Sequence, residues 1–435
     1  MPPTKLTNMV RHADTTWTGV PRAVFTGGNE VQLLRGGDML FPAMVEAISK
    51  ATSEVWLATY IFNNDPGGDA VAQALADAAR RGVQVRVVLD GFGCKGSFPQ
   101  LSTVLLPAGV QLTIFRPLKR WWNWLQPGQL RRLHQKLCVV DGRVGFVGGI
   151  NMLDDRLDLH HGWSDTPRLD FAVQFSGPAV QAVEQTISAV WTRAQLGRHF
   201  KQEVSLIARE AQPLANAKRL IRRLRMTQKL ELASPVSNTQ TLAPMHAAFV
   251  LRDNFRQRRT IERSYIEAIR RSRTRIDLIS AYFYPGRAFR RALVEAAQRG
   301  VTVRLLLQGK LDYRMAGLAA RALYDELLGH GVRIFEYTPA FLHAKVAVVD
   351  DDWATVGSSN IDPLSLLLNL EANMVVRDKK FANELAAEFE AAVAASTEID
   401  PAQTYRPGVL GALRRGLVAW CAHVYLRLAG ATGKY

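Results

Sequence analysis

The sequence contains few cysteines and lacks a long apolar segment. Its three cysteines, Cys94, Cys138 and Cys421, are too few and too widely spaced for a disulfide framework or a cysteine-based metal site. The N-terminal residues lack the apolar core of a signal peptide, and no stretch of about 20 apolar residues runs without a charge. We therefore expect a protein of a reducing, cytosolic compartment without a transmembrane helix.

Acidic residues are scarce relative to basic ones. The 39 Asp and Glu residues are outnumbered by 55 Lys and Arg residues, which gives a formal net charge of +16 at pH 7. This charge favours partners that carry phosphates, either nucleic acid or an anionic membrane surface, and does not by itself separate the two. The 435 residues, 48% of them apolar, allow two or three globular domains.

One pattern of five residues occurs twice. The stretches LHQKLCVVDGRVGFVGGIN (133–151) and LHAKVAVVDDDWATVGSSN (342–360) share it at identical spacing. A single His-x-Lys would be a weak signal, but two of only nine histidines begin this pattern, which indicates an internal duplication. The matched pairs are His134 and His343, Lys136 and Lys345, Asp141 and Asp350, Gly148 and Gly357, and Asn151 and Asn360.

The duplication extends upstream of these stretches, because 44–62 resembles 265–283 and 78–91 resembles 296–309. Each half alternates amphipathic helices with strands of apolar β-branched residues, which predicts an α/β fold made of two sandwich-like repeats. We expect the repeats to pack with pseudo-two-fold symmetry around a shared active site. The predicted divisions are a first repeat (22–200), a basic linker region (201–255), a second repeat (256–400) and an amphipathic tail (401–435).

The paired motifs predict a phosphate-binding cleft. Alternate side chains of a strand share one face, so the His and the Lys of each motif point the same way. If the halves pack about an approximate two-fold axis, both pairs meet in one cleft. The predicted phosphate-binding residues are Lys136, Lys345, Asn151, Asn360 and Ser358.

Two histidines can exchange one phosphodiester for another without a metal or a cofactor. A neutral imidazole attacks phosphorus while the opposite imidazolium protonates the leaving oxygen, which requires a carboxylate to orient at least one ring. Asp141 and Asp350 lie seven residues beyond their histidines, roughly 23 Å along an extended strand. We therefore predict that they shape the motif turn, and that Asp170 and Glu371, at matching places on the next strands, orient the histidines.

The duplicated HxKxxxxD pattern, followed by a Gly-Ser-x-Asn element in the second copy, resembles the phospholipase D superfamily over residues from about 30 to 400. The stretch 331–373 and FVLRDN (249–254) are similar, more narrowly, to bacterial cardiolipin synthases of the B type. The first motif departs from this pattern, with Gly149 at the position of Ser358.

The resemblance implies transfer of a phosphatidyl group between two phosphatidylglycerol molecules through a phosphohistidine, with His134 as nucleophile and His343 as acid and base. It implies anionic phospholipids as partners, no cofactor, and a peripheral location on the cytoplasmic face of a bacterial inner membrane. The alternatives are a phospholipase D-type hydrolase and a nuclease with the same two-histidine chemistry, which the net charge of +16 would also serve.

Other segments allow two interpretations each. Trp121, Trp122 and Trp124, among basic residues, suit a lipid interface or a packed aromatic cluster. The basic segment 218–229 suits membrane contact or a solvated helical face, and the apolar stripe of 410–428 suits the membrane surface or a cap on the second half. We interpret GFGCKG (91–96) as a loop rather than a dinucleotide site, and His160 and His161 as lacking the partners of a metal site.

Overall fold

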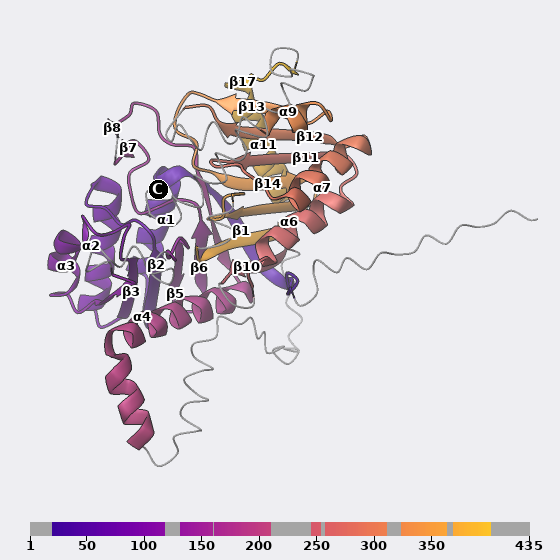
Figure 1. The fold of residues 1–435 in the computed structure, drawn as a ribbon. Coiled ribbons are helices and arrows are strands. Elements are labelled where there is room, and N and C mark those ends of the chain that lie inside the picture. Colours follow the sequence, from indigo (N-terminus) through magenta and orange to yellow (C-terminus); the bar gives the residue numbers. More distant parts are fainter. Residues whose placement is uncertain are drawn as a thin grey trace, which may run out of the picture.

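The computed structural model describes residues 20–117, 131–159, 161–209, 245–253, 257–310, 323–362 and 369–401 (Figure 1). The predictions for the three tryptophans, for 218–229, for 410–428 and for His160 lie outside these ranges. Within them, no helix has the length and hydropathy needed to cross a bilayer. No group of three or more potential ligands in the same ranges could hold a metal ion.

The first half alternates strands and helices and ends in a long helix. Its elements are β1 (Thr26–Arg35), α1 (Gly36–Ser49), β2 (Glu54–Thr59), α2 (Pro66–Arg80), β3 (Gln84–Asp90), α3 (Phe98–Leu105), β4 (Gln111–Phe115), β5 (Leu137–Val140), β6 (Val144–Gly148), the short ribbon β7 (Leu157–Asp158) and β8 (Gly162–Trp163), β9 (Phe171–Ser176) and α4 (Ala179–Arg209).

The second half follows the same plan. Its elements are β10 (Met245–Arg252), α6 (Thr260–Arg271), β11 (Arg275–Ser280), α7 (Arg287–Gln298), β12 (Thr302–Gln308), α9 (Tyr324–Leu328), β13 (Arg333–Tyr337), β14 (Lys345–Val349), β15 (Trp353–Gly357), β16 (Glu371–Arg377), α11 (Lys379–Ala394) and β17 (Ser396–Glu398).

All described strands except β7 and β8 form one large sheet whose order is nearly a mirror image about its centre. The order is β17-β13-β12-β11-β14-β15-β16-β10-β1-β9-β6-β5-β2-β3-β4, and the antiparallel pair β1 and β10 joins the halves. Figure 1 shows the two half-sheets side by side with helices on both faces. The predicted α/β fold of two matching repeats is therefore confirmed.

The region predicted as a linker, 201–255, contains parts of the folded structure. Helix α4 continues past residue 200, and β10 lies within 201–255, the region predicted as a linker. Strand β10 is central to the sheet because it pairs with both β1 and β16. We therefore place the start of the second half at Met245 rather than at residue 256.

Local sequence features determine where the helices begin and end. Asp65 caps α2 by accepting from the Gly68 N–H, with Pro66 at the first helical position. Asp378 caps α11 in the same way through the Phe381 N–H. The turns that follow α2 and α7 contain Gly82 and Gly300 at φ of 91° and 87°, a conformation that glycine adopts without strain. The turns after the two matching helices therefore share one backbone conformation.

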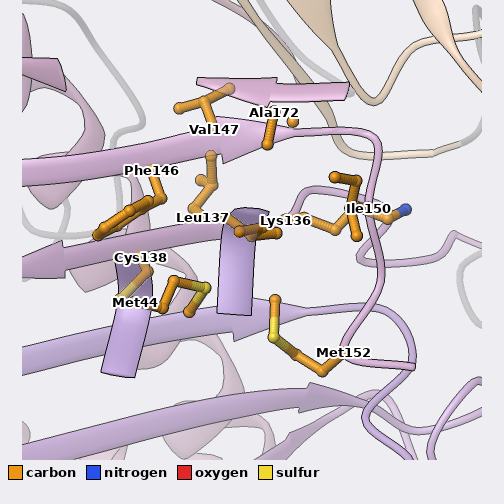
Figure 2. A pocket seen from close by; sticks show the side chains of 11 residues that line it. Met44, Lys136, Leu137, Cys138, Phe146, Val147, Ile150, Met152 and Ala172 are labelled. Carbon is orange, nitrogen blue, oxygen red and sulfur yellow. The ribbon is translucent and has the colours of Figure 1, made fainter. Parts of the chain in front are cut away.

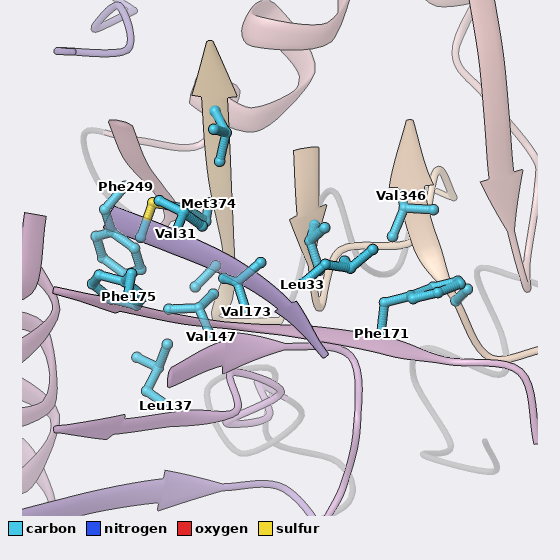
Figure 3. Packing of buried hydrophobic residues seen from close by; sticks show 14 of the residues in the cluster. Val31, Leu33, Leu137, Val147, Phe171, Val173, Phe175, Phe249, Val346 and Met374 are labelled. Carbon is cyan, nitrogen blue, oxygen red and sulfur yellow. The ribbon is translucent and has the colours of Figure 1, made fainter. Parts of the chain in front are cut away.

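The core has a shared centre and one outer layer for each half. Alternate residues of β2 face opposite sides, so Trp56 and Ala58 join the central cluster whereas Val55 and Leu57 pack under α1 and α2. The central cluster contains residues of both halves together with α4 and α11. Figure 3 shows residues of β1, β9, β10 and β16 in contact there, and this shared core holds the two motifs in a fixed relation.

Candidate active site

The two motif segments cross into the opposite halves just before their histidines. The His134 N–H donates to the Leu370 carbonyl at 3.1 Å, and the His343 N–H donates to the Leu169 carbonyl at 2.9 Å. Each histidine is thereby placed beside the first residues of a strand from the other half, β16 or β9. The parallel bridges at this crossing are Leu133 with Leu370 and Leu169 with Leu342.

Each histidine contacts a carboxylate of the other half. His134 Nδ1 lies 3.0 Å from Glu371 Oε2, and His343 Nδ1 lies 2.6 Å from Asp170 Oδ2. The side chains of Glu371 and Asp170 are 0% and 2% exposed. Because Nδ1 is engaged on both rings, Nε2 is the nitrogen left for a substrate. The two carboxylates singled out from the sequence thus lie at the histidines, in a crossed pairing that the sequence did not indicate.

Two buried lysines accompany the histidines. Lys136 Nζ donates to the His134 carbonyl at 2.8 Å, and Lys345 Nζ donates to the His343 carbonyl. Burial lowers the pKa of Lys136 to about 7 and that of Lys345 to about 8. A phosphate in the cleft would stabilise the charged form of both lysines. Ligand binding and lysine protonation are therefore coupled here.

A small apolar pocket lies against Lys136 and explains part of this shift. Figure 2 shows Met44, Cys138, Phe146 and Met152 around it, between α1 and the strands β5 and β6. These side chains offer no hydrogen-bond acceptor of useful strength to an ammonium group. The aliphatic chain of Lys136 therefore sits in an apolar environment that disfavours the charged form.

Asn151 and Asn360 are each 5% exposed, and within the described part of the chain their amide oxygens have no hydrogen-bond partner. Ser358 differs from its predicted phosphate-binding role. It is fully buried, and its hydroxyl donates to Glu371 Oε2 at 2.6 Å while accepting from the Ala372 N–H. The geometry assigns Ser358 to holding Glu371 and leaves the two amides for a ligand.

Gly149 explains why the first half lacks a matching serine. A Cβ atom at Gly149 would lie 2.4 Å from Asp170 Oδ1, closer than real contacts allow. The shorter Asp170 carboxylate packs directly on this glycine and accepts instead from the Phe171 N–H. The two halves therefore hold their carboxylates by different means, Ser358 with Glu371 and Gly149 with Asp170.

The two carboxylates differ in proton affinity. Burial raises the pKa of Asp170 to about 7. Burial acts in the same direction on Glu371, but the neighbouring His134, Lys136 and Ser358 outweigh it and lower its pKa. Burial also lowers the pKa of both histidines, most strongly for His343, where nearby cations add to the effect. At neutral pH Glu371 is ionised, whereas the Asp170 pair titrates.

Asp141 and Asp350 lie away from the cleft. Asp141 accepts hydrogen bonds from the backbone N–H groups of 52–54, at the start of β2. Asp350 accepts from those of 273–275, at the start of β11. Both residues have positive φ values, 51° and 54°, in the turns after β5 and β14. Their contacts fit the turn-shaping role predicted for them, and neither carboxylate contacts a histidine.

A residue that the sequence reasoning missed is Asp90, at the end of β3. Its Oδ2 accepts from the Leu133 N–H at 2.8 Å, while Oδ1 accepts from the N–H groups of Phe92 and Gly93. Gln308 occupies the matching place and accepts from the Leu342 N–H at 3.1 Å. Both side chains fix the residue before a histidine. A buried aspartate that ends an apolar strand before Gly91 was the available signal.

Comparisons with known proteins show the family of the chain. The sequence model of the family described as "Cardiolipin synthase, PLD-like domain" matches residues 44–162 and 265–393. The chain is 34% identical over 380 residues to cardiolipin synthase B of Escherichia coli K12, covering 85% of this chain and 82% of that protein. It is also 34% identical over 391 residues to cardiolipin synthase A of Pseudomonas putida GB-1, covering 88% and 73%.

Among solved structures, phosphatidylserine synthase of Haemophilus influenzae Rd KW20 matches with a TM-score of 0.60. The match covers 92% of this chain and 94% of that one at 12% sequence identity. At this identity the match supports the fold alone.

Proposed function

Because the chain belongs to the cardiolipin synthase family with PLD-like domains, we propose that it is a phosphatidyltransferase that makes cardiolipin from two phosphatidylglycerol molecules. The observation that carries the proposal is the pair of crossed histidine–carboxylate contacts, His134 with Glu371 and His343 with Asp170. Two imidazoles held with Nε2 available can attack a phosphodiester and protonate its leaving group within one site.

In the first step, Nε2 of His134 attacks the phosphorus of a donor phosphatidylglycerol. An N–P bond forms, the bond from phosphorus to the headgroup glycerol oxygen breaks, and protonated His343 gives that oxygen its proton. In the second step, His343 removes the proton from a glycerol hydroxyl of a second phosphatidylglycerol. That oxygen attacks phosphorus, the N–P bond breaks, and cardiolipin leaves with both histidines restored.

The difference between the two carboxylates supports this assignment. Glu371, ionised at neutral pH, accepts the Nδ1–H of His134, so the lone pair of Nε2 stays available for attack. Asp170, whose pKa burial raises to about 7, can share a proton with His343. A pair that gains and loses a proton near neutral pH suits the acid and base role.

The lysines and amides would stabilise the charge on phosphorus. Lys136 and Lys345 each donate one hydrogen bond to a backbone carbonyl, and an ammonium group has three N–H donors. The remaining donors, with the amides of Asn151 and Asn360, are placed to hold the non-bridging oxygens in the transition state. Preorganised donors of this kind are worth several kcal/mol, of the order of 3 kcal/mol for one donor.

Phosphatidylglycerol as both donor and acceptor, and peripheral attachment to the cytoplasmic face of the inner membrane, belong to the same proposal. The net charge of +16 supports attraction to an anionic lipid surface. An exchange of one phosphodiester for another needs no nucleotide, which agrees with the absence of a Walker loop in the sequence.

The test is to incubate the purified protein with phosphatidylglycerol vesicles, without nucleotide or added metal, and to follow lipid products and free glycerol. Equal amounts of cardiolipin and glycerol are expected from the wild type, and no transfer from His134→Ala or His343→Ala. Phosphatidic acid alone would instead identify a hydrolase. No lipid turnover together with cleavage of nucleic acid would identify a nuclease.

A further inference from the structure

The segment before the first motif carries positive charges that the matching segment of the second half lacks. Residues 116–132, between β4 and the first motif, include five cations and no Asp or Glu. The matching segment of the second half, 338–341, reads TPAF and carries no charge. The two segments are equivalent, because each follows a strand paired in the same register, Phe115 with Asp90 and Tyr337 with Gln308. The cations are therefore an addition to the two-fold plan.

Two of these arginines have buried guanidinium nitrogens that lack a hydrogen-bond partner among the described residues. Arg132 is 7% exposed, and both of its terminal guanidinium nitrogens lack a partner among the described residues. One terminal nitrogen of Arg116 is buried in the same condition. The guanidinium carbon of Arg132 lies 5.2 Å from the ring centre of Phe92, so an aromatic face covers one side of the group. Leaving such donors unpaired is costly, which suggests that a ligand completes them.

The protein supplies too little negative charge to balance this cluster. Asp90 is the acid that attracts Arg132 and Arg116, but both its oxygens already accept backbone hydrogen bonds. Burial also raises the pKa of Asp90, which weakens it as a counter-charge. Burial and repulsion from Arg131, Arg132 and Arg193 lower the pKa of Arg116 to about 10. An anion entering the cluster would relieve this repulsion.

The cluster adjoins the reacting groups. Arg132 is two residues before His134, and Asp90 holds the Leu133 N–H between them. Asp90 also acts electrostatically on Lys136. The Arg132 carbonyl accepts from the Leu370 N–H, at the crossing that brings Glu371 to His134. The backbone of Arg132 therefore forms part of the crossing that places His134 beside Glu371.

We propose that Arg116 and Arg132 form a second phosphate subsite, which binds the phosphodiester of the acceptor phospholipid. The proposal rests on the proposed function, because only a phospholipid acceptor brings a second phosphate to the cleft. In phosphatidylglycerol the attacking hydroxyl and this phosphate are joined by a three-carbon glycerol, so both fit in one cleft. A guanidinium group binds two phosphate oxygens at once, which suits this ligand better than an uncharged alcohol.

The decisive experiment compares two acceptors for the same covalent intermediate, in which His134 carries the phosphatidyl group. Transfer to phosphatidylglycerol is measured as cardiolipin, and transfer to glycerol as incorporation of labelled glycerol into phosphatidylglycerol. In Arg132→Met, cardiolipin formation is expected to fall about tenfold or more while glycerol exchange stays within about twofold of the wild type. Arg116→Met should act in the same direction. Arg143→Met, an exposed arginine in the turn after β5, is the control and should change neither rate.

The two rates separate this proposal from the proposed function. A wild type that makes no cardiolipin would refute the proposed function. A wild type that makes cardiolipin, with both rates falling equally in the arginine variants or neither falling, would refute the acceptor subsite. Arg132→Lys keeps the charge but not the planar fork, so it should restore cardiolipin formation only in part.

Ligand binding gives a readout independent of activity. Glycerophosphoglycerol, the soluble headgroup with one phosphodiester, should raise the Tm of the wild type more than that of Arg132→Met. Equal shifts in both proteins would overturn the subsite. If inorganic phosphate raises the Tm of the wild type more than that of Arg132→Met, and glycerophosphoglycerol raises both equally, the cluster binds free phosphate. The assignment to a lipid phosphate then fails. Without ligand, Arg132→Met should be at least as stable as the wild type, because it removes buried donors that lack hydrogen-bond partners among the described residues.

Discussion

At the scale of single residues, the site is asymmetric although the fold around it is repeated. Glu371 is held by a serine hydroxyl and a histidine, whereas Asp170 is held by a backbone N–H and lies against Gly149. A side chain at position 149 would collide with Asp170, whereas Ser358 and Glu371 fit together at the matching positions of the second half, so the two differences belong together. His134 thus has a partner, Glu371, that is ionised at neutral pH, whereas the partner of His343, Asp170, gains or loses a proton near pH 7.

This asymmetry predicts distinct defects for two conservative variants. Glu371→Gln removes the acceptor charge behind the proposed nucleophile and should slow the release of the first glycerol, on the order of 100-fold. Asp170→Asn should lower turnover to a similar extent and should also change the limb of the pH–rate profile near pH 7, because one of the groups that titrate there is gone. Rapid-quench measurement of glycerol release, with full pH profiles, checks both.

The half-buried residue Glu54 supplies a control for these variants. It pairs with Arg86 outside the cleft, and Glu54→Gln should keep the wild-type rate and pH profile. If Asp170→Asn left the limb near pH 7 as it is in the wild type, or if Glu371→Gln left glycerol release unchanged, the division of roles between the histidines would be wrong.

The sequence was sufficient to predict which residues meet in the cleft, but not how they pair. His134, Lys136, Asp170 and their counterparts follow from a repeated spacing, which a single chain displays. The crossed contacts depend on Leu133 lying beside Leu370, a tertiary bridge with no local sequence signature. The hydrogen bond of Ser358 was not predicted for the same reason, since its hydroxyl is directed by Glu371 from another strand.

At the scale of elements, the turns after β5 and β14 are fastened to β2 and β11 by one aspartate each. Asp350 accepts three backbone N–H groups and the Thr274 hydroxyl. The adjacent Asp351 makes only an exposed ion pair with Lys379. Two neighbouring aspartates therefore have very different expected contributions to stability.

Asp350→Ala should lower the free energy of unfolding by about 2 kcal/mol, whereas Asp351→Ala should change it by less than about 0.5 kcal/mol. Hydrogen bonds lower the pKa of Asp350 despite its partial burial. Its contribution is thus complete well above the unfolded pKa of about 3.9 and is lost as the pH falls through the lower folded pKa. Urea unfolding at several pH values measures this. A loss of activity without a loss of stability would instead indicate a catalytic role.

The limits of sequence prediction at this scale are visible at β10. Its residues Met245–Arg252 form an apolar strand, but the preceding segment has no counterpart in the first half, so the repeat offered no alignment to anchor it. The place of β10 is decided by partners distant in sequence, β1 and β16. By contrast α2 and α7 were predictable, because their spacing and the glycines after them are local.

At the scale of the whole molecule, the halves are repeats in sequence but share one core. The central hydrophobic cluster includes Phe171 and Val183 of the first half and Met374 and Phe389 of the second. The sheet also continues from one half to the other through β1 and β10. Each histidine is oriented by a carboxylate across this junction, so activity and folding depend on the same contact between halves.

This architecture predicts a single cooperative unfolding transition for the described domain pair. Because neither half can expose its side of the central cluster without losing apolar burial in the other, calorimetry should show one peak with matching calorimetric and van't Hoff enthalpies. Asp141→Ala in the first half and Asp350→Ala in the second should both shift that same peak to lower temperature. Two peaks, each moved by only one of the variants, would mean that the halves fold independently and that the crossed pairs form only after docking.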